Sequence, residues 1–271
     1  MKDFFHIPVM VKEVLYYLSP REGGIYVDCT VGTGGHSLAI LQKTGGKVKL
    51  VGIDWDEEIL RIASRRLEPY RESVILMQEN FAEIDSVLKK YDLGKVDGFL
   101  YDLGVCQVHF DDFSRGFSFR EDAPLDMRMD RRKDITAAHL VNSLSKRELE
   151  EVFLKLGEER WARRIAEFVV EERKKRPIET TGQLVEVLRK AIPAKFRRGR
   201  RLHFATKVFQ ALRIAVNQEL ENLKISLSKA IPLLGEGGRI CVISYHSLED
   251  RIVKQKFKQM EGKGLSLLTR R

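Results

Sequence analysis

The sequence has little cysteine: three residues in a chain of 271, with no two close enough to form a CxxC pair. Cys29, Cys106 and Cys241 therefore indicate neither a zinc site nor a disulfide framework. Long apolar runs are also missing, because no segment approaches the ~20 residues that a membrane-spanning helix needs. Lys12 and Glu13 interrupt the apolar stretch near the N-terminus, which argues against a secretory signal. We expect a cytoplasmic protein with no membrane segment and no metal site.

Acidic residues are in deficit as well. The chain has 39 Asp and Glu against 48 Lys and Arg, which gives a formal net charge of +9. Such an excess favours a polyanionic partner, nucleic acid above all. A solvated basic surface without a partner is the alternative, and composition alone does not choose between the two.

Short apolar strands alternate with amphipathic helices at both ends of the chain, a pattern typical of a mostly parallel, doubly wound α/β sheet. We predict a long helix over about 206–230. The predicted strands are 25–29, 48–54, 74–78, 96–103 and 239–244. The middle of the chain begins with a long loop without periodicity and continues as helices. We therefore predict a core formed by 1–109 and 206–271, and a helical domain inserted at 110–205.

A glycine-rich segment, VDCTVGTGGHS, follows the first predicted strand. Gly32 and Gly34 fit a dinucleotide-binding G-x-G-x-x-G pattern, but Ser37 stands in the third glycine's place, and the lysine of a P-loop is missing. Asp28 would repel a pyrophosphate and favour a cation. S-adenosylmethionine carries an ammonium and a sulfonium and no phosphate, so the segment favours this methyl donor over a nicotinamide cofactor.

Polar and aromatic residues also follow the next three predicted strands, where ligands of open parallel sheets bind. Asp54 comes about 20 residues after the glycines, where an acidic residue accepts hydrogen bonds from ribose hydroxyls. Phe81 could contact an adenine, and Asp102 would face the reacting centre. Each residue alone has a structural alternative as a helix cap or a core side chain, but together they indicate one ligand.

Seven segments in the same order resemble one family, the bacterial small-subunit (16S) ribosomal RNA cytosine-N4 methyltransferase H family. They include HIPVMVKEVL, VDCTVGTGGHS, VDGFLYDLGV, PLDMRMD, HFATKVFQALRIAVNQELENL and SYHSLEDRIVK. The resemblance spans about residues 6–260. It implies a class I (Rossmann-like) methyltransferase with a helical insert, S-adenosylmethionine as donor, and a cytidine near the ribosomal P site as acceptor. The partner would be small-subunit rRNA or the assembled small subunit.

The resemblance and the strand-end pattern together give a set of candidate donor contacts. These are Asp28, Gly32, Gly34, Gly35, His36, Asp54, Phe81, Asp102 and His109. His109 stands where the family commonly has a glutamine, and Gln107 could replace that contact only if the loop shifts. The sequence stops at Arg271, before the basic tail usual in relatives, so a final sheet segment and part of the RNA surface are expected to be missing.

Asp102 is also the candidate catalytic residue, as acceptor of an N–H bond from the cytosine amine; its competing role is a contact to the donor's amino group. Three segments are expected to contact the substrate. Their residues are Phe119, Asp126 and Arg128 on the long loop, Arg197, Arg198, Arg200 and Arg201 in a basic segment, and Ser244, Tyr245 and His246 after the last strand. Alternatives remain: an ion network for Asp126 and Arg128, core packing for Tyr245, and solvated charge for the arginines.

Two other classes of function remain open from the sequence. A methyltransferase that acts on a small molecule would share the donor site but would not need a basic insert. A non-catalytic RNA-binding module would keep the positive charge but would not need carboxylates after successive strands.

Overall fold

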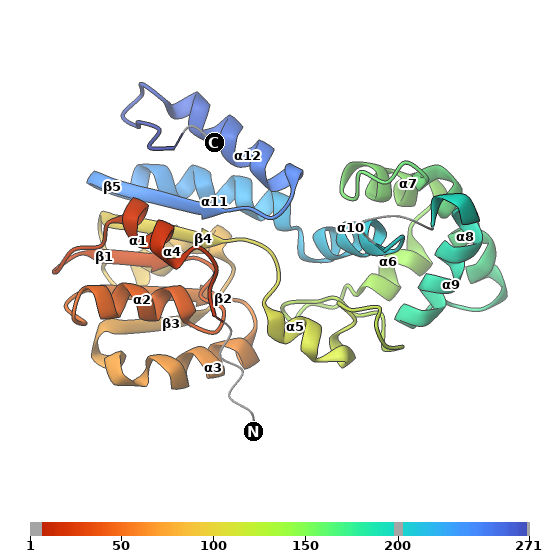
Figure 1. The fold of residues 1–271 in the computed structure, drawn as a ribbon, viewed down its shortest axis with the longest axis horizontal. Helices are drawn as coiled ribbons and strands as arrows, with labels where there is room; N and C mark the ends of the chain where they lie inside the picture. The colour runs from red at the N-terminus through yellow and green to blue at the C-terminus, as the bar shows by residue number, and fades with distance from the viewer. Residues whose placement is uncertain (1–6, 198–202, 270–271) are drawn as a thin grey trace. The chain divides into compact units, whose positions relative to one another are not determined.

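A computed structural model describes residues 7–197 and 203–269, and the structural statements below concern these residues. The chain divides into two compact units: one contains the residues up to Cys106 and from Leu220 onward, and the other is Gln107–Glu219. Figure 1 labels the elements of both units. Within the described ranges, no helix combines the length and the apolar character needed to cross a membrane.

The first unit is built on a five-stranded sheet whose strands pair in parallel, in the order β3-β2-β1-β4-β5 (Figure 1). The strands are β1 (Ile25–Asp28), β2 (Lys49–Asp54), β3 (Val74–Gln78), β4 (Val96–Asp102) and β5 (Leu234–Ile243). The strand order reverses beside β1, so the carboxyl ends of β1 and β4 flank the switch point of a Rossmann-like sheet. The predicted class I fold is confirmed.

Helices cover both faces of this sheet, because successive strand residues point to opposite sides. Tyr26 packs with buried residues of α1 (Val11–Leu18), α2 (Gly35–Lys43) and α3 (Glu57–Leu67). Its neighbour Val27 belongs to the other cluster. The helices of that cluster are α4 (Ile84–Lys90), α11 (Glu219–Leu233) and α12 (Ser247–Met260). Two short 3-10 turns, η1 (Glu68–Ser73) and η2 (Phe81–Glu83), flank β3.

The second unit is helical in its described residues. Its elements are α5 (Gln107–Asp111), η3 (Phe113–Arg115), α6 (Ala137–Ser143), α7 (Lys146–Lys155), α8 (Ala162–Lys175), α9 (Thr181–Ala191), η4 (Ala194–Phe196) and α10 (Thr206–Asn217). Side-chain caps set several helix starts: Ser145 and Thr180 each form a capping box, with Glu148 and Gln183. The buried side chains of Ile165 on α8 and Leu184 on α9 belong to the interior of this unit.

The single long helix predicted over 206–230 is wrong. Gln218 lies between α10 and α11 with φ 52°, a left-handed conformation that ends the first helix. A continuous apolar stripe hides this break from the sequence, since neither glycine nor proline marks it. The consequence is a different boundary from the predicted 110–205, because α10 groups with the second unit, Gln107–Glu219.

Asn217, the last residue of α10, anchors the loop that contains PLDMRMD. Its Oδ1 accepts a hydrogen bond from the backbone N of Met129 at 2.8 Å, and its Nδ2 donates to the carbonyls of Met127 at 2.8 Å and Arg213 at 2.9 Å. Met127 has φ 64°, a conformation that a side chain of this size rarely adopts without support. The buried amide therefore holds a strained loop in place.

Replacing this amide should destabilise the second unit. We expect Asn217→Ala to lower the free energy of unfolding by about 2–3 kcal/mol, because it leaves buried backbone groups unpaired and releases the strained loop. Urea unfolding followed by circular dichroism measures this. Gln210→Ala on the same helix is the control and should change stability by less than about 0.5 kcal/mol. Equal stability of the two variants would contradict the anchoring role.

Candidate active site at the strand ends

The glycine-rich loop joins β1 to α2 at the carboxyl edge of the sheet. Gly32 has φ 52° and Gly34 has φ 79°, so both adopt the left-handed conformation that glycine tolerates best. A Cβ on Gly34 would also lie 3.2 Å from Cγ of Leu67 on α3. The glycines therefore let the loop turn tightly into α2, which begins at Gly35.

Asp28 stabilises this loop through two hydrogen bonds. Its buried carboxylate, 2% exposed, accepts a hydrogen bond from the backbone N of Thr30 at 3.2 Å and one from the Ser37 hydroxyl at 2.7 Å. Burial raises the pKa of Asp28, and the Ser37 bond opposes that rise. Ser37, which stands in place of a third glycine, is thus the partner of Asp28. The structure gives Asp28 a role in the shape of the loop, and its direct contact with a donor stays a prediction.

Asp54, at the end of β2, connects the loop to the start of α3. Its Oδ2 accepts a hydrogen bond from the backbone N of Gly32 at 3.1 Å, and its Oδ1 accepts one from the backbone N of Asp56 at 3.0 Å. The side chain is partly exposed. Desolvation of its carboxylate outweighs both hydrogen bonds and raises the pKa to about 7. A hydroxyl that donates to this group would favour its ionised form.

Asp102, at the end of β4, is held in place from three sides. Its backbone N donates to the Thr30 hydroxyl at 2.6 Å, which ties it to the glycine-rich loop. Its Oδ1 accepts a hydrogen bond from the Tyr245 hydroxyl at 2.8 Å, and its Oδ2 lies 3.4 Å from Nε2 of His36. Burial, and next the Asp102 carboxylate, raise the pKa of Tyr245. The phenol is therefore a hydrogen-bond donor at neutral pH.

His36 supplies the observation that tests whether a polar ligand fits here. Its ring is 6% exposed at the start of α2. Within the described residues, Nδ1 has no hydrogen-bond partner, and Nε2 has only the Asp102 carboxylate, 3.4 Å away. Buried ring nitrogens without a close partner are costly unless a ligand contacts them. Together with the carboxylates of Asp54 and Asp102, they fit a ligand that has hydroxyl and ammonium donors, which S-adenosylmethionine has.

The aromatic residue predicted to contact an adenine is largely packed into the core. Phe81 is 8% exposed, and its ring centroid lies 6.0 Å from those of Trp55 and Tyr101. Trp55, directly after Asp54, is not among the site residues predicted from the sequence, although its position after a strand-end carboxylate was an available signal. Phe81 and Trp55 form an aromatic pair beside β2, and adenine contact by Phe81 stays a prediction.

The three residues predicted to contact the substrate after β5 differ in their surroundings. His246 caps α12, since its Nδ1 accepts a hydrogen bond from the backbone N of Glu249 at 3.4 Å and the Glu249 side chain accepts one from the backbone N of Tyr245 at 2.8 Å. Ser244 is partly buried at the end of the strand. Tyr245 is 57% exposed while its hydroxyl contacts Asp102. Of the three predicted substrate contacts, only Tyr245 touches the strand-end carboxylates.

Several predicted site residues lie in the second unit. The guanidinium of Arg128 donates to both carboxylate oxygens of Asp126, at 2.7 and 2.9 Å, so the pair braces its own loop. Phe119 stacks on His203 with ring centroids 4.6 Å apart. His109 is buried, with its ring 4.8 Å from that of Phe117. Their contacts with donor or substrate stay predictions.

The basic segment is only partly described. Arg197 is half-buried next to η4, whereas Arg198, Arg200 and Arg201 lie outside the described residues. The contacts of this segment with RNA also stay a prediction.

Comparison with known proteins gives an independent result. Residues 3–268 match the model of the MraW methylase family. A Clostridium botulinum protein named ribosomal RNA small subunit methyltransferase H is 50% identical, with 96% of this chain and 83% of the relative covered. A protein of the same name from Symbiobacterium thermophilum is 51% identical, with 94% and 80% covered. The resemblance found in the sequence motifs is confirmed.

Solved structures are more distant. One from Clostridium thermocellum, provisionally described as an rRNA-methylase, is 15% identical with a TM-score of 0.46 and covers 93% of this chain and 81% of its own. The methylase match, on a sheet of this topology, confirms S-adenosylmethionine as the methyl donor.

Donor binding should weaken below pH 7. Ribose hydroxyls donate to the ionised form of Asp54, so the donor lowers a pKa that stands at about 7 in the free protein. The bound state then holds fewer protons, and the dissociation constant should rise by up to about tenfold per pH unit below that pKa. Calorimetry above and below this pH measures the effect. Asp54→Asn is the control and should bind weakly without this pH dependence; a wild-type affinity that does not change with pH would contradict the assignment.

Proposed function

Because the chain belongs to the MraW methylase family, we propose that it transfers a methyl group from S-adenosylmethionine to N4 of a cytidine in small-subunit rRNA, near the ribosomal P site. The names of its relatives support rRNA as the substrate, and the net charge of +9 suits a polyanion. The observation that carries the proposal is Asp102 at the switch point of the sheet: its backbone N donates to the Thr30 hydroxyl, and its carboxylate contacts His36 and Tyr245.

Residues at different strand ends bind different parts of the donor. Asp54 accepts hydrogen bonds from the ribose hydroxyls, as carboxylates after the second strand do in related sheets. Asp102 and His36 contact the amino-acid end, where a carboxylate pairs with an ammonium. This edge does not suit a pyrophosphate, because the carboxylates of Asp54 and Asp102 would repel it.

The chemistry of the acceptor amine makes its orientation the main catalytic requirement. When bound, the donor supplies an electrophilic methyl group on a sulfonium. The exocyclic amine of cytosine is a poor nucleophile because its lone pair is delocalised into the ring. The protein must therefore hold the nitrogen in line with the methyl group and accept its N–H bonds, a contribution of positioning more than of acid–base chemistry. The backbone carbonyls of 103–105 follow Asp102 directly and can accept those bonds.

Tyr245 connects the two sides of the site. Its hydroxyl is fixed on Asp102 and more than half of its side chain is exposed, so its ring offers a surface for stacking beside the reacting centre. A cytosine that is paired or stacked in RNA cannot reach a strand-end site, so the nucleotide must be splayed out of its helix. Stacking on Tyr245 offsets part of the lost base stacking.

The product distinguishes this proposal from attack on the pyrimidine ring. Incubation with labelled donor and small ribosomal subunits, naked rRNA or free cytidine, followed by nucleoside digestion, should give N4-methylcytidine from an RNA substrate. Tyr245→Ala should lower kcat/KM for RNA by about tenfold, the value of one stacked base. Cys106→Ala should retain transfer, since no cysteine nucleophile takes part. The product 5-methylcytidine, or loss of transfer in Cys106→Ala, would contradict the proposal, and transfer to free cytidine alone would favour a small-molecule enzyme.

A further inference from the structure

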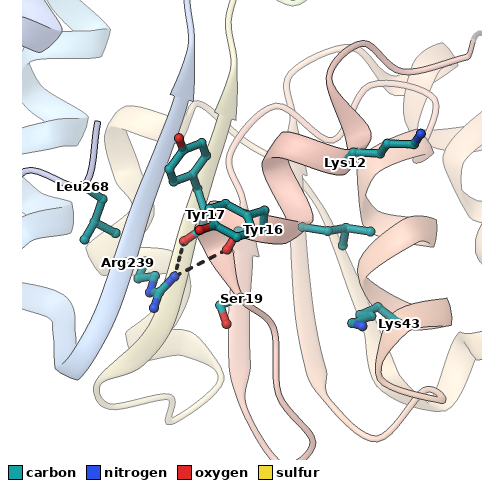
Figure 2. Close-up of a pocket in the computed structure, with 8 residues that line it drawn as sticks. Lys12, Tyr16, Tyr17, Ser19, Lys43, Arg239 and Leu268 are labelled. Carbon is teal, nitrogen blue, oxygen red and sulfur yellow. Dashed lines mark hydrogen bonds between the residues drawn. The ribbon is translucent and has the colours of Figure 1, made fainter. Parts of the chain in front are cut away.

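The first unit contains a pocket at the amino ends of its strands. Figure 2 shows this pocket of about 680 Å³, lined by residues of α1, the end of α2, β5 and the C-terminal segment. The side chains used in the argument are Lys12, Tyr16, Tyr17, Lys43 and Arg239.

The pocket lies away from the donor loop. Lys43 is the last residue of α2, whose first residue, Gly35, belongs to that loop, and a nine-residue helix is about 13 Å long. Arg239 pairs in the sheet with Gly98, whereas the donor site is at Asp102, where β4 ends. The two sites therefore occupy opposite ends of the same sheet.

Positive charge in the pocket is not neutralised by its lining. Three cationic side chains line it, from three different elements, and none of the lining residues is acidic. Arg239 is already engaged, because its Nη1 donates to the carbonyls of Tyr17 at 2.8 Å and Tyr16 at 3.5 Å at the end of α1. Lys12 and Lys43 are exposed, and the structure gives neither an ion pair within the described residues.

Two acidic groups in the adjoining segments have partners of their own, while Glu13, next to Lys12 on α1, is exposed and forms no ion pair with it within the described residues. Glu22 pairs with Lys47 at 3.0 Å, and Asp97 pairs with Arg21 at 2.6 Å. The two lysines of the pocket therefore remain available to an anion from outside.

An exposed aromatic ring stands beside these lysines. Tyr16 is 75% exposed and packs edge-on against Tyr17, with ring centroids 5.0 Å apart at 85°. Lys12, Leu15, Tyr16 and Ser19 recur at helical spacing, so one side of α1 and its end presents a cation, an aromatic ring and a hydroxyl together. Cations that flank an exposed aromatic ring are the arrangement by which proteins bind single-stranded nucleic acid, through phosphates and a stacked base.

We propose that this pocket binds a single-stranded segment of RNA, with phosphates on Lys12 and Lys43 and one base stacked on Tyr16. The inference rests on the proposed function, because it takes rRNA as the substrate. It adds a second contact surface on the methyltransferase unit, remote from the reacting atoms, which fixes the RNA without taking part in transfer.

The test uses the full chain and a single-stranded oligoribonucleotide of about 20 nucleotides, longer than the 4–16 nucleotides that single-strand binding folds typically cover. Lys12→Gln with Lys43→Gln should reduce the slope of log K against log[salt] by about 1.4, at about 0.7 for each lost phosphate contact. Tyr16→Ala should weaken binding about tenfold, while Tyr16→Phe should bind like the wild type because it keeps the ring. Donor affinity should not change in any of these variants.

Lys47→Gln is the matched control, since Lys47 is an exposed lysine that is already paired with Glu22; its salt slope should equal that of the wild type. An unchanged slope and affinity in the double lysine variant, with the wild type binding RNA normally, would overturn the pocket and leave the proposed function standing. A wild-type protein that neither binds nor methylates RNA would overturn the proposed function and the pocket together.

Discussion

The hydrogen bond between the backbone N of Asp102 and the Thr30 hydroxyl joins the ends of β4 and β1. Parallel pairing of these strands places the glycine-rich loop next to Asp102, and the loop in turn carries Gly32 to Asp54 and His36 to Asp102. Strand register thus brings together residues that are far apart in the sequence. The arrangement of the candidate site is a consequence of the sheet order.

Much of this arrangement could be predicted from the sequence. The strand ends were within reach because each buried strand is a short apolar run that stops at a polar residue, as at Asp54 and Asp102. The glycine-rich loop was recognisable because a tight turn into a helix needs positive φ at Gly32 and Gly34. Local chain geometry and apolar periodicity were therefore sufficient for the fold class and for the strand ends where the candidate donor residues lie together.

The remainder depends on contacts that no local pattern encodes. The break at Gln218 has no glycine to mark it, and its backbone N–H donates to carbonyls of α10 itself, so the apolar stripe of α10 and α11 reads as one helix. Tyr245 and Asp102 are 143 residues apart, and only the pairing of β4 with β5 brings them within hydrogen-bond distance. His246 is instead a helix cap, for which the His-x-x-Glu spacing up to Glu249 was an available signal.

The central claim is that the strand-end carboxylates bind the donor through its charge, and Asp102→Asn tests it most directly. This variant keeps the shape of the side chain and removes its charge, so calorimetry should show S-adenosylmethionine binding weakened by tenfold or more, corresponding to about 1.5–3 kcal/mol for a hydrogen bond to a charged group. Asp97→Asn, on the same strand but in an ion pair with Arg21, should bind the donor like the wild type. Wild-type donor affinity in a folded Asp102→Asn protein would contradict the account.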